Sequence, residues 1–108
     1  MAIVAVASGA QAAAINTEHA LALQTGVGIY VLMVDTSAMQ ADDSLTLRIK
    51  TKRAAGDTAR IAYAYTHNDV QQEPNKYSVP VPSDTEISFT LLQTAGTGRT
   101  YPWKVLRA

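Results

Sequence analysis

Side chains that could carry out catalysis or bind a metal are few in this sequence, and they are scattered. The two histidines, His19 and His67, lie far apart along the chain. A zinc site needs such ligands close together in space, usually with further nitrogen, sulfur or carboxylate ligands. The run His67-Asn68-Asp69 comes nearest to that pattern, but it belongs to a polar stretch that we interpret as a solvated loop. We therefore predict no metal site.

Two carboxylate groups, Asp42-Asp43 and Asp84-Thr85-Glu86, are also candidates for acid–base chemistry. A glycosidase needs two carboxyl groups facing each other across a cleft, whereas neighbouring residues on a strand point to opposite faces. Both groups flank expected turns, so we predict that they shape turns. The glycine pairs Gly26-Val27-Gly28 and Gly96-Thr97-Gly98 complete neither nucleotide-binding pattern, and no nucleophile-elbow motif is present. The prediction is a protein without catalytic residues or cofactor.

Basic residues are concentrated in one part of the chain: Arg48, Lys50, Lys52, Arg53 and Arg60. Two interpretations stay open, a docking patch for an acidic protein surface and a solvated sheet face on which cations discourage edge aggregation. Nucleic-acid binding is disfavoured, because nine lysines and arginines are balanced by nine acidic residues and such binding needs a positive excess.

Four aromatic residues stand at positions that could form a sugar-binding platform: Tyr63, Tyr65, Tyr101 and Trp103. Each also lies at the core-facing phase of an expected strand. We predict that all four pack into the core, with the sugar-binding role as the alternative.

Extended strands are the elements that must position these residues. Between Ser44 and Lys52, Leu45, Leu47 and Ile49 alternate with polar residues, the period of a half-buried strand. The stretch from Thr58 to Thr66 alternates again after a short connection, which predicts a β-hairpin. Similar alternation predicts strands at 86–92 and 100–106, and the segment 15–23 is either a strand or a short helix.

Other segments have signatures of their own. The unbroken apolar run from Ile29 to Val34 predicts a central strand buried on both faces. Residues 77–82 carry alternating prolines, which cannot donate ladder hydrogen bonds, and we place this strand at a sheet edge. Residues 1–14 are rich in alanine and are expected to form an arm or an edge strand.

These elements predict one all-β domain over residues 1–108, a β-sandwich or jelly roll of seven or eight short antiparallel strands. Charged residues make up 17% of the chain, below the usual ~25%, which indicates that a partner covers some of the surface. Zero net charge removes a barrier to self-association, so we expect a homo-oligomer. No apolar run reaches the ~20 residues of a membrane span, and the N-terminus lacks the positive start of a secretion signal. We expect no membrane partner.

Several ordered segments resemble a group of small virion proteins of tailed bacteriophages: Ile15–His19, Gly28–Ser37, Asp43–Lys52, Phe89–Arg99 and Tyr101–Trp103. Some small β-proteins of phages are capsid cement, or decoration, proteins. The resemblance implies a protein made in the host cytoplasm that binds across major capsid protein subunits at the capsid surface. It carries no catalytic motif, and it leaves open a tail or head-completion subunit. The aromatic residues of the strands keep a carbohydrate-binding β-module as a further alternative.

Overall fold

The computed structural model describes residues 2–108, and Met1, the first residue of the expected arm, lies outside it. The described chain is all β and contains no helix, as predicted. Its nine strands are β1 (Val4–Ala12), β2 (Glu18–Gln24), β3 (Gly28–Asp35), β4 (Ser44–Thr51), β5 (Arg60–Asn68), β6 (Asn75–Tyr77), β7 (Val81–Ser83), β8 (Ile87–Ala95) and β9 (Thr100–Arg107).

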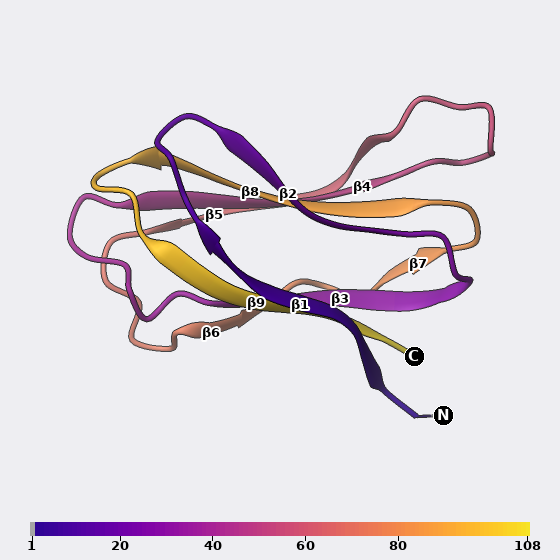
Figure 1. Ribbon diagram of the computed structural model, residues 1–108, viewed down its shortest axis with the longest axis horizontal. Coiled ribbons are helices and arrows are strands. Elements are labelled where there is room, and N and C mark those ends of the chain that lie inside the picture. The colour runs from indigo at the N-terminus through magenta and orange to yellow at the C-terminus, as the bar shows by residue number, and fades with distance from the viewer. Residues whose placement is uncertain (1) are drawn as a thin grey trace.

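The strands form two antiparallel sheets that lie one over the other (Figure 1). The first sheet has the order β1-β9-β3-β6, with β7 also paired to β3; the second has the order β2-β8-β4-β5. The hairpin β4-β5 stays within one sheet, as predicted, whereas most other connections pass from one sheet to the other. This two-layer arrangement is a β-sandwich.

Alternation along each strand builds the core between the sheets. Leu45, Leu47 and Ile49 of β4 are at most 1% exposed, and the residues between them face outwards. The neighbouring strand β8 adds a second row of buried side chains to the same core: Ile87, Phe89 and Leu91. Tyr30 of the first sheet meets Phe89 of the second with ring centroids 6.1 Å apart, so one aromatic pair joins the two layers.

Strand β3 is apolar on both faces, but only its inner face is buried. Tyr30, Leu32 and Val34 have no exposed surface, whereas Ile29 is 42% exposed and its outward neighbours are half-buried. The prediction of a strand covered on both sides is wrong in this respect. The described chain builds two layers, so the outer face of the first sheet has no third layer to cover it.

The sheet edges follow the chemistry of their residues. The stretch 77–82 lies at one edge of the first sheet, as predicted, but it is not one strand: Tyr77 ends β6, Pro80 lies in the connection, and Pro82 belongs to β7. At such an edge the missing N–H of a proline is tolerated. Residues 4–12 of the N-terminal segment form β1 at the other edge, paired with β9. The helical alternative for residues 15–23 is excluded, since β2 occupies most of that segment.

The turn between β8 and β9 depends on a glycine. Gly96 has φ of +87°, a conformation that residues with a Cβ adopt with strain. A Cβ at this position would also overlap the Oδ1 atom and backbone of Asp43. Glycine is therefore required here both for its backbone angle and for its lack of a side chain.

We expect Gly96→Ala to lower the free energy of unfolding by about 2 kcal/mol or more, through backbone strain and the clash with Asp43. The matched control is Gly56→Ala, where an added Cβ meets nothing within 4 Å. That change should be neutral or stabilising by ~0.4–1 kcal/mol. Urea unfolding of the two variants measures the difference, and equal stabilities would contradict this account of the turn.

Candidate functional site

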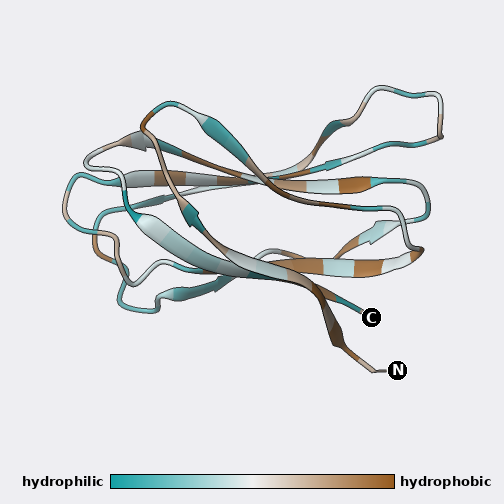
Figure 2. Cartoon of the chain, viewed as in Figure 1, coloured by the Kyte–Doolittle hydropathy of each residue, from teal (hydrophilic) through white to brown (hydrophobic). Residues whose placement is uncertain are grey.

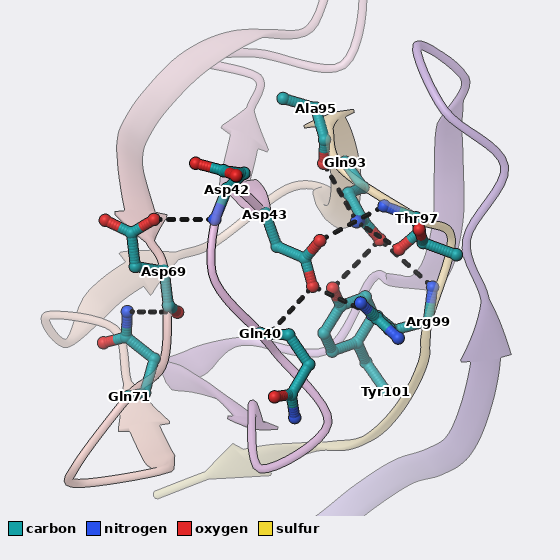
Figure 3. Close-up of polar contacts among 10 residues, drawn as sticks. All are labelled: Gln40, Asp42, Asp43, Asp69, Gln71, Gln93, Ala95, Thr97, Arg99 and Tyr101. Carbon is teal, nitrogen blue, oxygen red and sulfur yellow. Dashed lines mark hydrogen bonds and ion pairs between the residues drawn. The ribbon is translucent and has the colours of Figure 1, made fainter.

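A buried carboxylate, Asp43, joins the loop before β4 to the turn between β8 and β9 at one end of the sandwich (Figure 3). Its Oδ2 accepts hydrogen bonds from the Gln40 backbone N–H and from Arg99 Nε, both at 2.9 Å. Its Oδ1 accepts one from the Thr97 backbone N–H at 3.2 Å. The side chain is 1% exposed and fully engaged by the chain itself, so Asp43 organises the loops and is not placed to act on a substrate. This agrees with the turn role predicted for it.

A second buried polar side chain, Gln93, completes this network from strand β8. Its Nε2 donates to the carbonyls of Ala95 and Thr97, at 3.0 and 2.7 Å. Its Oε1 accepts from the Tyr101 hydroxyl at 3.0 Å and from the Arg99 backbone N–H at 3.2 Å. Both donors and both lone pairs of the amide are thus used. Sequence reasoning missed Gln93, although it is the polar residue that continues the inward-facing alternation of β8.

The ionisation of this network follows from its burial and its donors. Burial by itself raises the pKa of Asp43, but the hydrogen bonds from Arg99, Gln40 and Thr97 outweigh it and hold the pKa below the ordinary 3.8. Burial raises the pKa of Tyr101 to about 12, so its phenol stays protonated as the donor to Gln93.

The predicted basic residues divide into separate groups in the structure. Arg48 and Lys50 lie on the outer face of the second sheet, where both contact the Glu18 carboxylate at 3.2 Å. Thr90, which lies opposite Arg48 on β8, donates to the same carboxylate at 2.7 Å. The Thr90 hydrogen bond, and then those from Lys50 and Arg48, lower the pKa of Glu18 despite its partial burial. Much of this predicted docking patch is therefore neutralised within the chain.

The remaining basic residues do not join that group. Lys52 pairs with Glu86 at 3.3 Å, and Arg53 pairs with Asp57 at 3.0 Å across a turn. Arg60 lies opposite Thr51, beyond a shift of register in the hairpin. It therefore lies on the other face of the sheet from Lys50, since successive strand residues point to opposite faces.

The four aromatic residues are not gathered into a platform. Tyr101 is fully buried, and Trp103 packs against the core with its indole ring over Gly9 of β1. Tyr63 is half-buried, but Tyr65 is 55% exposed and stacks at a tilt on His67. The prediction of core packing is wrong for Tyr65, because β5 is an edge strand and its side chains are covered on one side at most.

The histidines and glycine pairs have structural surroundings. His19 Nε2 accepts a hydrogen bond from the Ala14 backbone N–H at 3.0 Å, and the Gly26 carbonyl accepts one from the Tyr30 hydroxyl. Burial, followed by the nearby charge of Lys76, lowers the pKa of His67 from 6.5.

Within residues 2–108, no three histidine or acidic side chains gather where a metal ion could be held. The same residues include no helix long and apolar enough to cross a membrane.

The most distinctive surface is the outer face of the first sheet. Ile29, Val31 and Met33 form its central row on β3; Val31 lies opposite Leu106 of β9, and Ile29 opposite Pro82 of β7. We call this surface the apolar face. Figure 2 shows the apolar character of β3 and of the chain near the N-terminus.

Part of the apolar face is hollowed. A depression of about 200 Å³ is lined by Ile3, Ile29, Val31, Pro80, Leu106, Arg107 and Ala108. A second, more open depression shares Ile29 and extends towards Val27, which is 74% exposed. The outer face of the second sheet contrasts with it, since β4 presents Thr46, Arg48 and Lys50 there. The apolar face is the candidate functional site, and its chemistry is suited to docking.

Comparison with protein-family models, with curated proteins and with solved structures finds no match to this chain.

We expect Asp43→Asn to lower the free energy of unfolding by roughly 2–3 kcal/mol, because it weakens charge-assisted hydrogen bonds at a buried site. The control, Asp42→Asn, alters an exposed carboxylate next to it whose backbone has φ of 71°, a conformation that asparagine tolerates. Chemical denaturation at pH 7 measures both, and an equal loss in the two variants would contradict the role of Asp43.

The same pair of variants gives a pH prediction. The pKa of Asp43 is lowered in the folded state, so its contribution is present above the unfolded value and is lost as the pH falls through the folded value. The stability gap between the native protein and Asp43→Asn should therefore be constant near neutral pH and shrink below about pH 4. A gap that widened on acidification would overturn this assignment.

Proposed function

We propose that this protein is a structural subunit of a tailed-bacteriophage virion, a capsid cement or decoration protein that binds across major capsid protein subunits at the capsid surface. The observation that carries the proposal is the apolar face. A sheet of a small domain that presents Ile29, Val31 and Leu106 outwards exposes surface of the kind that marks an interaction site.

The rest of the described chain supports a binding role. The buried side chains of Asp43 and Gln93 form their hydrogen bonds with other groups of the same chain. Within residues 2–108 no buried side-chain nitrogen or oxygen lacks a hydrogen-bond partner. No buried polar side-chain atom in these residues is therefore left to bind a substrate, and the proposal includes no enzymatic activity or cofactor.

The charges favour a protein partner over nucleic acid. Arg48 and Lys50 share the Glu18 carboxylate, and the chain has no positive excess. Binding to phosphate backbones is dominated by uncompensated lysine and arginine. The resemblance to phage virion proteins suggests which protein partner this is, namely the major capsid protein of the capsid shell.

Attachment to a repeating shell explains how a modest surface could suffice. One copy that touches neighbouring capsid subunits resists their separation, and many copies act on the shell together. Each contact needs little affinity of its own, because the second contact of a bound copy is made at high effective concentration.

The test is the addition of purified protein to expanded capsids that lack it. We expect binding, and increased resistance of the capsids to heat. Val31→Lys, which places a charge in the apolar face, should weaken binding by about tenfold or more, ~1.4 kcal/mol. The matched control is Leu92→Lys, a half-buried apolar residue at an outward position of the second sheet opposite Glu18 and Thr46; this variant should bind normally.

Three outcomes would count against this proposal. Absence of binding to expanded capsids would contradict the cement role. Equal weakening of binding by both lysine variants would contradict the assignment of the apolar face as the binding surface. Stoichiometry in intact particles supplies the third test: hundreds of copies on the head fit cement, a handful or a dozen indicate a head-completion subunit, and copies along a tube indicate a tail subunit. A double variant Arg48→Gln/Lys50→Gln tests the predicted basic contact separately.

A further inference from the structure

The free edge of β5 includes a regular stretch that lacks the protection against pairing found at the other sheet edges. At one edge of the first sheet, β6 and β7 are three residues long and are separated by a stretch that contains Pro80. Strands β1 and β2 each carry a shift of register that marks a bulge. Short strands, prolines and bulges are the usual devices that keep edges from pairing. The β4-β5 ladder also has a shift of register, between Ile61 and Tyr63, but from Tyr63 to Asn68 β5 pairs regularly with β4 and has none of these devices.

The direction of the unused backbone groups can be read from a single hydrogen bond. The Asp69 N–H donates to the Asp43 carbonyl at 2.8 Å, where the β4-β5 ladder begins. In an antiparallel strand, alternate residues point their N–H and C=O to the same neighbour. Residues 63, 65 and 67 therefore bond to β4, and Ala64, Thr66 and Asn68 point to the free edge. Gln71 Nε2 donates to the Asn68 carbonyl at 2.6 Å from outside the ladder, which agrees with this direction. A carbonyl oxygen has two lone pairs, so this oxygen can accept a second hydrogen bond from a pairing strand.

The side chains of β5 are accessible on both faces. Seven of its nine residues are exposed, among them Ile61 at 56% and Tyr65 at 55%. The stretch from Ile61 to Thr66 contains no charged residue. A second copy laid antiparallel along it would place no like charges opposite each other, which is a condition for stable cross-strand pairing.

We propose that β5 is a self-association edge, at which two copies of this chain pair β5 with β5 about a two-fold axis. The axis lies at Thr66, since this register keeps the pairing within residues 64–68 and clear of the irregularity near Ile61. The second sheets of the two copies then form one continuous eight-stranded sheet, four strands from each. The same patch serves both copies, as a closed two-fold dimer requires.

This inference does not rest on the proposed virion role. The apolar face belongs to the first sheet and the β5 edge to the second, so a dimer leaves two apolar faces free. A protein that dimerises but does not bind capsids would overturn the proposed function alone. A monomer that binds capsids would overturn this inference alone.

The chain has no cysteine, so single-cysteine variants report proximity without background. Two-fold pairing at Thr66 brings the two copies of this residue to a Cα separation of ~5.5 Å, within the range that a disulfide spans. Under mild oxidation we expect Thr66→Cys to form a covalent dimer at least tenfold faster than Ala20→Cys. Ala20 is the matched control, an exposed residue on β2 at the opposite edge of the same sheet.

Sedimentation equilibrium provides the second measurement. The native protein should have twice the mass of the chain, and Thr66→Lys should shift it to monomer, because the two-fold axis would place two lysines directly opposite each other. Ala20→Lys should remain a dimer, and far-ultraviolet circular dichroism should show both variants folded. A monomeric native protein, equal crosslinking of Thr66→Cys and Ala20→Cys, or a dimer unaffected by Thr66→Lys would each overturn the proposal. Faster crosslinking of Ala64→Cys than of Thr66→Cys would support the edge and move the axis by two residues.

Discussion

The inward side chains of two sheets bury one another, and in residues 2–108 no third layer covers the outer faces. Side chains alternate across a strand, so each strand of the sandwich can give one face to this shared core. The core is closed by large residues such as Tyr30 and Phe89, which meet across the layers. This packing leaves the outer faces of the sheets, the sheet edges and the loops outside the core.

The outer faces of the two sheets have become chemically different. On the second sheet, Arg48 and Lys50 converge on Glu18, so that face is polar and largely neutralised internally. On the first sheet, Ile29 and Val31 face solvent beside Leu106. A fold needs only one buried face per strand, so the second apolar row on β3 adds little to the monomer. A partner that covers it is the physical explanation we favour.

The loops at one end of the sandwich are fixed by polar contacts instead of apolar ones. Asp43 and Gln93 are both buried, and each forms hydrogen bonds with backbone groups that would otherwise lack these partners. Such networks stabilise a fold when every member has a partner, as is the case for buried side-chain atoms in residues 2–108. Gly96 belongs to the same arrangement, because its bare Cα leaves room for the Asp43 carboxylate.

The sequence by itself determined the all-β class, the β4-β5 hairpin and the turn role of Asp43, because a period of two and turn chemistry are local properties of the chain. It could not determine that the outer face of β3 stays uncovered, since the run from Ile29 to Val34 is equally apolar whether or not a third layer covers that face. It also could not place Arg60, whose face depends on a single shift of register in β5. The Asp43 network joins residues 54 and 56 positions apart, and Glu18 reaches partners 30 and 32 positions away. Contacts of that kind exist only after the sheets have packed, so the tertiary structure alone decided which charges are neutralised, which polar groups are buried and which surfaces remain for a partner.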